Sequence, residues 1–365
     1  MRLAYGIHGY GRGHATRALA ILSELGRRHD LRVFAGGDAF EALRDTCPVV
    51  WVPHLEFVYR GGRRSILRTL RGNLPLLADL VQAGSHTRTV VDAMREFAPQ
   101  AVLCDCEPFT ARAAKMLSIP HVSLDHFGIM ARCKVDLPWL DWAKSFLDRT
   151  LYMAMFGSAR HSLVSSFYQA RPRSSRVRVI GTLLRNQARA VAPSSGDHLL
   201  AYFNRGSEQF TPGIARVLRR AGHELRLYGT GREGRDDSIR FCPASDRGFL
   251  EDLASARAVI GTAGNQLVGE AMHFGKPLMV MPEPSVEQRM NAAAIVRLGI
   301  GESTTARKFT AEALGAFLDR TPEYAARARR EAHDGREEAL ATLETWFAEI
   351  AAEDRAARVL GEATA

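Results

Sequence analysis

The chain has 365 residues, of which 46% are hydrophobic and 24% charged, a composition that is ordinary for a globular protein and excludes a disordered one. A single hydrophobic core stops growing before this length, so we expect two domains. No stretch reaches the roughly 18–20 apolar residues of a membrane-spanning helix, and the scattered cysteines imply no disulfide framework. The formal net charge is +9, and such a surface can attract anionic lipid, phosphorylated substrates or nucleic acid.

The first half of the chain alternates short β-rich runs with longer helical runs, which is typical of βαβ units and a parallel sheet. The predicted strands are Leu3–Ile7, Leu31–Ala35, Val49–Val52, Ala101–Asp105, His121–Leu124, His161–Ser165 and Val177–Ile180. Helices such as Arg17–Arg28 and Pro108–Leu117 are predicted between them. Because the apolar start Met1–Ile7 is too short for a signal peptide and resembles a strand, we expect a cytoplasmic protein.

A second series of the same kind follows a cluster of breaker residues, Pro193–Gly196. Its predicted strands are His198–Phe203, Leu225–Tyr228, Ile239–Cys242, Ala258–Ile260 and Pro277–Met281. We therefore expect an α/β protein with Rossmann-like domains at 1–185 and 198–322, joined by a linker at 186–197. Residues 323–365 are rich in Ala, Arg and Glu, and we expect a helical tail that is able to pack back on the N-terminal domain.

A glycine-rich turn joins the first predicted strand to the helix after it. Gly9, Gly11 and Gly13 allow the backbone to approach an anion at the helix N-terminus, but their spacing misses a dinucleotide fingerprint, and Asp38 fits its acidic position only loosely. His14 follows at the carboxyl edge of the sheet, where ligands bind in such folds. An imidazole there can take a proton from a hydroxyl group near neutral pH. The alternative is a histidine exposed to water at a helix start.

Two further predicted strands carry polar side chains to the same edge. Asp105 ends a strand, and a carboxylate bonded to His14 would orient the ring and stabilise its protonated form. The alternative for Asp105 is capping of the helix that begins near Pro108. Asp125 and His126 follow the next strand and are expected to line a binding site, with a satisfied turn as the alternative.

The most informative segment follows the predicted strand Ala258–Ile260. A glycine-containing loop leads into a helix whose N-terminal N–H groups point at that loop, which suits an anion. The loop and first helical residues are Thr262, Ala263, Gly264, Asn265 and Gln266. Glu270 lies about two turns along this helix and can accept hydrogen bonds from ligand hydroxyls, as can Glu287 and Gln288 after the next strand. A plain strand–loop–helix unit is the alternative.

In this segment the sequence resembles the GT-B glycosyltransferases. It is similar to the group of lipid-linked N-acetylglucosaminyltransferases, galactolipid synthases and natural-product UDP-glycosyltransferases. Their shared pattern is matched in order by Gly264, Glu270, Ala271, Gly275, Pro277, Glu287, Gln288, Asn291 and Ala292. The turn Gly13-His14 and the pair Gly206-Ser207 also match the family. The resemblance implies two Rossmann-like domains whose parallel sheets face each other across a cleft.

The resemblance also implies an activity, the transfer of a sugar from a nucleotide-diphosphate donor, most often UDP, to an acceptor hydroxyl. The acceptor would be a glycan, a lipid-linked molecule or a small molecule. The implied donor-binding residues are Gly206, Ser207, Thr262, Ala263, Gly264, Asn265 and Gln266 for the phosphates, Glu270 for the ribose, and Glu287 and Gln288 for the sugar. The implied catalytic pair is His14 as the base with Asp105, and the implied acceptor-binding residues are Gly11, Gly13, Asp125 and His126.

Some positions depart from the pattern. Many relatives that use small acceptors carry a phosphate-binding His where Thr262 stands and an Asp where Glu287 stands, which leaves the identity of the sugar open. Many retaining members carry a second glutamate eight positions after the first, but Leu278 occupies that place here, so inversion of the anomeric centre is favoured. No Asp-x-Asp triplet occurs in the sequence, so we expect neither a metal ion nor another cofactor.

Arginines alternate with leucine and isoleucine over Arg60–Arg71. This pattern suits an interfacial segment on an anionic membrane surface, which would place the protein peripherally on the inner face of the membrane. It equally suits a mobile acceptor-binding loop or a solvated helix face. Nucleic acid is not expected as a partner, because the aromatic residues that stack on bases are missing from the segment.

Three other functions remain open at this stage. A nucleotide-sugar epimerase of the same fold would use the donor without an acceptor, and a catalytically inactive GT-B-like protein would only bind ligands. A nicotinamide-dependent oxidoreductase would explain the first glycine turn but nothing after Gly261.

Overall fold

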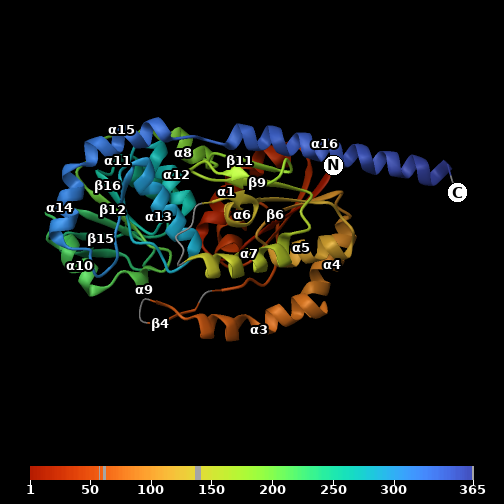
Figure 1. The fold of residues 1–365 in the computed structure, drawn as a ribbon, viewed down its shortest axis with the longest axis horizontal. Helices are drawn as coiled ribbons and strands as arrows, with labels where there is room; N and C mark the ends of the chain where they lie inside the picture. Colours follow the sequence, from red (N-terminus) through yellow and green to blue (C-terminus); the bar gives the residue numbers. More distant parts are fainter. Residues whose placement is uncertain (57, 61–62, 136–140, 364–365) are drawn as a thin grey trace. The chain divides into compact units, whose positions relative to one another are not determined.

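The structure is a computed structural model that describes residues 1–56, 58–60, 63–135 and 141–363 (Figure 1). Internal contacts divide the chain into two compact units. The first unit comprises Met1–Phe57, Leu67–Leu183 and Gly335–Ala365, and the second comprises Val58–Ile66 and Leu184–Asp334. The expected tail 323–365 is thus divided, with residues 323–334 in the second unit and 335–365 in the first.

The first unit is built on a seven-stranded sheet with the order β11-β9-β7-β6-β1-β2-β3. Its strands are β1 (Arg2–Ile7), β2 (Asp30–Ala35), β3 (Val49–Trp51), β6 (Ala101–Asp105), β7 (His121–Asp125), β9 (His161–Ser165) and β11 (Val177–Ile180), and neighbours pair in parallel. Each corresponds to a strand predicted from the sequence. The chain builds outward from β1 to β3 on one side and from β6 to β11 on the other, so the order reverses between β1 and β6.

Helices cover both faces of this sheet. They are α1 (Arg12–Arg28), α2 (Gly37–Leu43), α3 (Ile66–Gln82), α4 (Ser85–Phe97), α5 (Pro108–Met116), α6 (Gly128–Arg132), α7 (Trp142–Phe156) and α16 (Arg336–Ala363). Alternation along β1 assigns the faces, because Leu3, Tyr5 and Ile7 pack in a core with α1 and α16, whereas Ala4 packs in a core with α4 and α5. A Cβ on Gly6 would collide with Thr110, so α5 packs directly on the β1 backbone.

The second unit repeats this plan with the order β14-β15-β13-β12-β16-β17-β18. Its strands are β12 (Leu199–Tyr202), β13 (Leu225–Tyr228), β14 (Gly234–Asp236), β15 (Ile239–Phe241), β16 (Ala258–Gly261), β17 (Leu278–Val280) and β18 (Gly301–Ser303); only β14 pairs antiparallel. Its helices are α8 (Asn186–Ala190), α9 (Gly206–Gln209), α10 (Pro212–Arg219), α11 (Asp246–Ser255), α12 (Asn265–His273), α13 (Val286–Leu298), α14 (Ala311–Asp319) and α15 (Thr321–Glu331). The predicted fold class, two Rossmann-like α/β units, is confirmed.

Short pairs of strands complete the structure. They are β4 (Tyr59–Arg60) with β5 (Arg63–Arg64), and β8 (Cys133–Lys134) with β10 (Arg171–Pro172). The sequence did not predict these four, nor β14 and β18.

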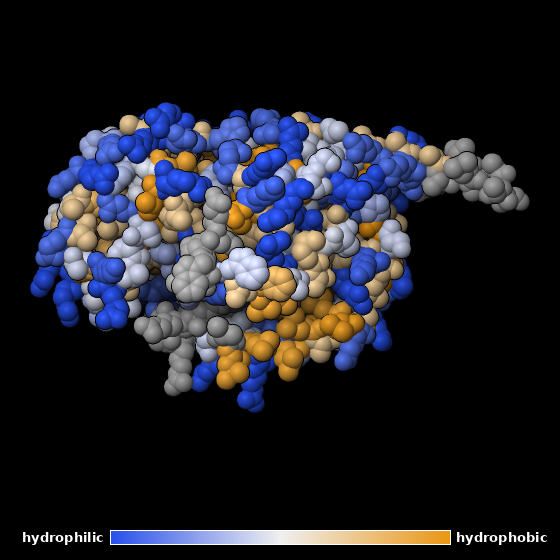
Figure 2. All heavy atoms as spheres, viewed as in Figure 1, coloured by the Kyte–Doolittle hydropathy of each residue, from blue (hydrophilic) through white to orange (hydrophobic). Residues whose placement is uncertain are grey.

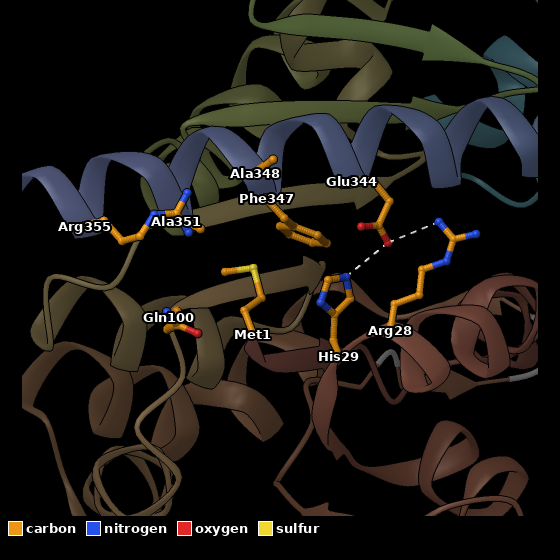
Figure 3. Close-up of a pocket in the computed structure, with 9 residues that line it drawn as sticks. All are labelled: Met1, Arg28, His29, Gln100, Glu344, Phe347, Ala348, Ala351 and Arg355. Atoms are coloured by element: carbon orange, nitrogen blue, oxygen red, sulfur yellow. Dashed lines mark hydrogen bonds and ion pairs between the residues drawn. The ribbon is translucent and has the colours of Figure 1, made fainter.

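Helix α16 closes the core of the first unit. Its residues Leu343, Phe347 and Ile350 are buried against α1 and the sheet. A pocket of about 380 Å³ lies between α16 and the amino ends of the strands (Figure 3), lined by Met1, Arg28, His29, Gln100, Glu344, Phe347, Ala348, Ala351 and Arg355. Within it, Glu344 pairs with His29 at 3.1 Å. This pocket is at the sheet edge opposite the one that carries the predicted site residues.

Candidate functional site

The first candidate site lies where the strand order of the first sheet reverses. In open α/β sheets, ligands bind outside the carboxyl ends of the strands at such a switch point. Here the adjacent strands are β1 and β6, paired in parallel up to Ile7 opposite Asp105. His14 comes from the helix after β1, and Asp105 ends β6, so the topology alone brings these two predicted residues to one place.

Helix α1 begins at Arg12, five residues earlier than predicted. Gly11 is its N-cap with φ of +79°, a left-handed conformation that favours glycine. The early start places both His14 and Arg17 inside the helix, three residues apart and therefore on the same face. Arg17 is a site residue that the sequence analysis missed, and the His14–Arg17 spacing was the signal that could have revealed it.

His14, Asp105 and Arg17 form one hydrogen-bonded group. The distance from His14 Nδ1 to Asp105 Oδ1 is 2.8 Å. Arg17 donates from Nε to Asp105 Oδ2 at 2.9 Å and from Nη2 to Oδ1 at 2.7 Å. The side chain of Asp105 is completely buried, whereas that of His14 is 23% exposed. The structure therefore brings the predicted pair together, with the imidazole as its solvent-accessible member.

The charge of Asp105 fixes the orientation of the imidazole. Burial alone would raise the pKa of this carboxyl, but the Arg17 guanidinium and the His14 ring outweigh it and hold the pKa below the usual value. An ionised carboxylate only accepts hydrogen bonds, so the 2.8 Å contact requires the proton on His14 Nδ1. In the neutral ring, Nε2 then carries the lone pair that can accept a proton.

Other side chains at this edge have structural partners. Glu107, not Asp105, caps helix α5 by accepting from the N–H groups of Phe109 and Thr110, so the capping alternative for Asp105 is wrong. Gly11 N–H donates to Asp38 Oδ2 at 2.9 Å. Asp38 therefore holds the glycine turn through one of its carboxylate oxygens.

The predicted acceptor residues Asp125 and His126 are both buried. Asp125 accepts from the Gly128 N–H through Oδ1 and from the Tyr152 hydroxyl through Oδ2 at 2.8 Å. His126 Nδ1 lies 2.9 Å from the carbonyl oxygen of Ser165. These contacts hold the turn between β7 and α6 and tie it to α7 and to the end of β9, which agrees with the satisfied turn that the sequence left open.

The second candidate site lies at the switch point of the second sheet, between β12 and β16. Gly206 follows β12, and a Cβ there would lie 2.6 Å from the carbonyl oxygen of Gly229, which follows β13. The loops after β12 and β13 therefore touch through their backbones. After β16 the loop reaches Gly264, which precedes α12. A Cβ on Gly264 would meet no atom within 4 Å, so this backbone faces open space. An exposed backbone before a helix N-terminus suits an anionic group.

Two side chains of α13 clamp the loop after β16 at Ala263. Gln288 Oε1 accepts from the Ala263 N–H at 3.2 Å and from the Glu283 N–H at 2.9 Å. Asn291 Nδ2 donates to the Ala263 carbonyl at 2.8 Å and to Glu287 Oε1 at 3.1 Å. The predicted sugar-binding residues Glu287 and Gln288 are thus brought to the glycine loop, where Gln288 braces the backbone.

Two contacts that sequence reasoning missed complete this region. Gln209, in α9, donates to Glu283 at 2.7 Å and thereby ties the loop after β12 to the loop after β17. Arg185 pairs with Glu270, Nε to Oε1 at 3.1 Å, and both side chains are almost fully buried. The predicted ribose-binding carboxylate is therefore held by an arginine 85 residues away, for which the sequence offers no local signal.

Metal-binding and membrane-spanning features were sought over the described ranges. No three His, Cys, Asp or Glu side chains of those residues gather as metal ligands would. None of the helices in the described part of the chain has the length and apolarity needed to cross a bilayer.

Comparisons with known proteins identify the family of this chain and similar solved structures. The sequence model of glycosyl transferase family 1 matches residues 1–322. Similar solved structures include CalG4, the calicheamicin glycosyltransferase, with a TM-score of 0.65 and 18% identity over 95% of this chain and 98% of that one. MurG of Acinetobacter baumannii has a TM-score of 0.60 and 16% identity over 94% and 99%. VinC, a glycosyltransferase in complex with dTDP, has a TM-score of 0.60 and 15% identity over 94% and 99%. No curated protein sequence matches the chain.

Proposed function

Because the chain belongs to glycosyl transferase family 1 and has the GT-B fold, it is a glycosyltransferase, and we propose that it is an inverting one with His14 as its base. The proposed donor is a nucleotide-diphosphate sugar, with UDP as the first nucleotide to test, and the proposed acceptor group is a hydroxyl. The observation that carries this proposal is the 2.8 Å contact between His14 and a buried carboxylate at the switch point of the first sheet.

The imidazole geometry supports the base role. With its Nδ1 proton bonded to Asp105, His14 can take the acceptor's hydroxyl proton at Nε2. The acceptor oxygen then bonds to the anomeric carbon while the bond to the nucleotide diphosphate breaks on the opposite face. Asp105 stabilises the imidazolium that forms, as an orienting carboxylate does in a catalytic triad.

The second unit supports the donor role. The leaving diphosphate gains negative charge as its bond breaks. Backbone N–H groups and the positive end of a helix dipole stabilise such charge. The open backbone at Gly264, next to the start of α12, is where we place the diphosphate, with Glu270 and Glu287 for ribose and sugar hydroxyls. The complex of VinC with dTDP is consistent with a nucleotide-diphosphate ligand in this fold.

The first experiment identifies the nucleotide. We expect one of UDP, GDP and dTDP to raise the melting temperature clearly, because a ligand at about 100 times its dissociation constant adds about 2.7 kcal/mol of stability. NAD serves as the negative control. Stabilisation by NAD alone would contradict the donor proposal.

The second experiment tests the base. With the selected donor and a panel of acceptors, His14→Gln is expected to lower turnover by about 10²–10⁴-fold while nucleotide binding is retained. Arg27→Gln, on the exposed far end of the same helix, is the matched control. Unchanged turnover in the His14 variant would exclude the base role. Incubation of the protein with the donor and no acceptor distinguishes the alternative functions. An epimerase would isomerise the donor, whereas an inactive binding protein would bind it without forming any product.

An anionic membrane surface is the partner that we propose for the first unit. Of the segment Arg60–Arg71, residues 61 and 62 lie outside the described residues, but the start of α3 exposes Leu67, Leu70 and Leu74 by more than half. Figure 2 shows hydrophobic side chains gathered over α3 and α7. The exposed large apolar side chains of α7 are Trp142, Phe146, Leu147, Leu151 and Met153. Exposed apolar patches of this kind mark interaction sites, and Arg68 and Arg71 add positive charge beside them.

Vesicles test this surface. We expect the protein to sediment with vesicles that contain anionic lipid and less with neutral ones. Leu70→Ser with Leu74→Ser should reduce this binding without changing nucleotide affinity, whereas Val296→Ser, at an exposed apolar position of the second unit, should not. Equal sedimentation of all three proteins would argue against a membrane role for α3.

A further inference from the structure

Arg17 is a buried cation that the proposed reaction does not use. Only 3% of the residue is exposed, and its guanidinium holds both oxygens of Asp105. Its Nη2 also lies 3.0 Å from His14 Nδ1. Because Nδ1 carries a proton toward Asp105, this short distance arises from two donors that share one acceptor, Oδ1. The imidazole of His14 and the guanidinium of Arg17 therefore lie side by side and both donate a hydrogen bond to the carboxylate of Asp105.

This arrangement changes the electrostatics of an Asp–His pair. A buried carboxylate is strongly unfavourable without a positive partner. If histidine were the only partner, the pair would favour the imidazolium, which cannot act as a base. Arg17 supplies a permanent positive charge to Asp105, so that the imidazole does not have to be protonated to balance it.

We propose that Arg17 is a positioning residue that acts as the permanent counter-ion of Asp105 and thereby keeps His14 neutral and able to accept a proton at Nε2. The inference rests on the proposed function, because it concerns the residue assigned as the base. In the step itself the proton moves from the acceptor hydroxyl to Nε2, and Nδ1 keeps its own proton on Asp105.

Two of the groups that surround His14 and Arg17 are neutral near neutral pH. From the segment after β1, His8 packs edge-on to His14 with ring centroids 5.1 Å apart. Burial and the nearby His14 lower the pKa of His8 to about 3, so it is neutral. From β1, burial raises the pKa of Tyr5 well above its usual value, so it is neutral too. Further titratable groups of this neighbourhood include Asp125 on β7, His54, Cys104 and Cys106. Burial raises the pKa values of Asp125, Cys104 and Cys106, which opposes ionisation of these groups.

The test measures the protonation of His14 without any substrate. The full chain is labelled with ¹³C-histidine, and the His14 ring signal, assigned by its loss in His14→Gln, is followed against pH. In Arg17→Gln we expect the titration midpoint of His14 to rise by about one pH unit or more, because a neighbouring positive charge is lost. Arg17→Lys should restore most of the wild-type midpoint, and Arg27→Gln should leave it unchanged.

A double variant covers the risk that Arg17→Gln folds poorly with Asp105 unpaired. Arg17→Gln with Asp105→Asn removes both charges, and its His14 midpoint should return toward that of wild type. An unmoved midpoint in Arg17→Gln, or the same upward shift in the single and double variants, would overturn the proposal.

The acid limb of the pH–rate profile gives a second readout once the donor and acceptor are in hand. It should move to higher pH in Arg17→Gln by the same amount as the His14 midpoint. Full turnover in His14→Gln would instead refute the proposed function while the titration result for Arg17 stood. The failures of the two proposals are therefore distinguishable.

Discussion

At the scale of single residues, Glu107 caps a helix although its burial disfavours the charged form of its carboxyl group. It caps α5 through both carboxylate oxygens, yet only 2% of the residue is exposed to solvent. Burial raises its pKa to about 7, against which the hydrogen bonds from Thr110 and Phe109 act only partly. Near neutral pH this carboxyl is therefore divided between its protonated and ionised forms.

The stability of the fold should depend on pH through Glu107. A carboxyl whose pKa is raised on folding contributes stability below its unfolded value, and loses it as pH rises through about 7. In Glu107→Gln we expect the loss of stability between pH 5 and pH 7.5 to shrink, by up to about 3 kcal/mol. Urea denaturation at the two pH values measures it, with the exposed Glu41→Gln as control. An identical pH dependence in wild type and Glu107→Gln would contradict this assignment.

The residues of the first candidate site could be predicted from the sequence where they follow or end a predicted strand. His14 and Asp105 follow apolar runs that read as neighbouring parallel strands, so their meeting could be expected. Arg17 was missed because the helix was predicted to begin there instead of at Arg12. Capping stayed open as the alternative for Asp105 because Pro108 marks a helix start without showing which preceding acid caps it, and the structure assigns the cap to Glu107.

At the scale of elements, the loops after β12 and β16 use glycine for different reasons. Gly206 packs against the backbone of Gly229, and a Cβ would also lie 2.8 Å from Thr230 N. Gly264 has φ of −72° and no neighbour for a Cβ. The first glycine thus serves packing within the unit, and the second leaves room for a ligand.

These two glycines form a matched pair of substitutions. Gly206→Ala should destabilise the protein by about 1–3 kcal/mol, because the clash is with backbone. Gly264→Ala should change stability by less than about 0.5 kcal/mol, but should weaken binding of the selected nucleotide about tenfold or more. Melting temperature and nucleotide titration separate the two effects. Tight binding to Gly264→Ala would remove this loop from the donor site.

The elements themselves were predicted unevenly. Buried parallel strands are continuous apolar runs, so the twelve predicted from the sequence are all present, with ends shifted by a residue or two. The strand Gly301–Ser303 carries no such run and is fixed by its pairing with β17. Likewise, the clamp on Ala263 depends on its contact with Asn291, which lies 28 residues later in the chain. The sequence motif includes Asn291, but the local sequence pattern does not show which backbone group its side chain contacts.

At the scale of the whole molecule, the first unit is assembled from distant parts of the chain. Helix α16 contributes Leu343, Phe347 and Ile350 to a core whose other members come from β1, β2 and α1. The sequence predicted a C-terminal helix from composition, but its break before Gly335 is set by tertiary packing. A Cβ on Gly335 would lie 2.7 Å from the Gly181 backbone nitrogen, so the chain returns to the first unit by direct backbone contact.

Phe347 offers a test of this closure. It is 1% exposed, and Phe347→Ala should lower stability by about 3–5 kcal/mol through lost burial and a cavity. Thr345→Ala, on the exposed side of the same helix, should change it little. Differential scanning calorimetry measures both variants, and a melting temperature for Phe347→Ala equal to that of Thr345→Ala would show that α16 is dispensable for the core.

The position of α16 also orders events on the ribosome. Residues 184–334 emerge before the helix that completes the core of the first unit, although the sheet of that unit is translated first. Domains generally fold as units during synthesis, so the core around Leu3, Tyr5 and Ile7 is covered by α1 early but stays incomplete until α16 has been made. A stop codon before α16 would therefore damage the unit whose sheet was made first.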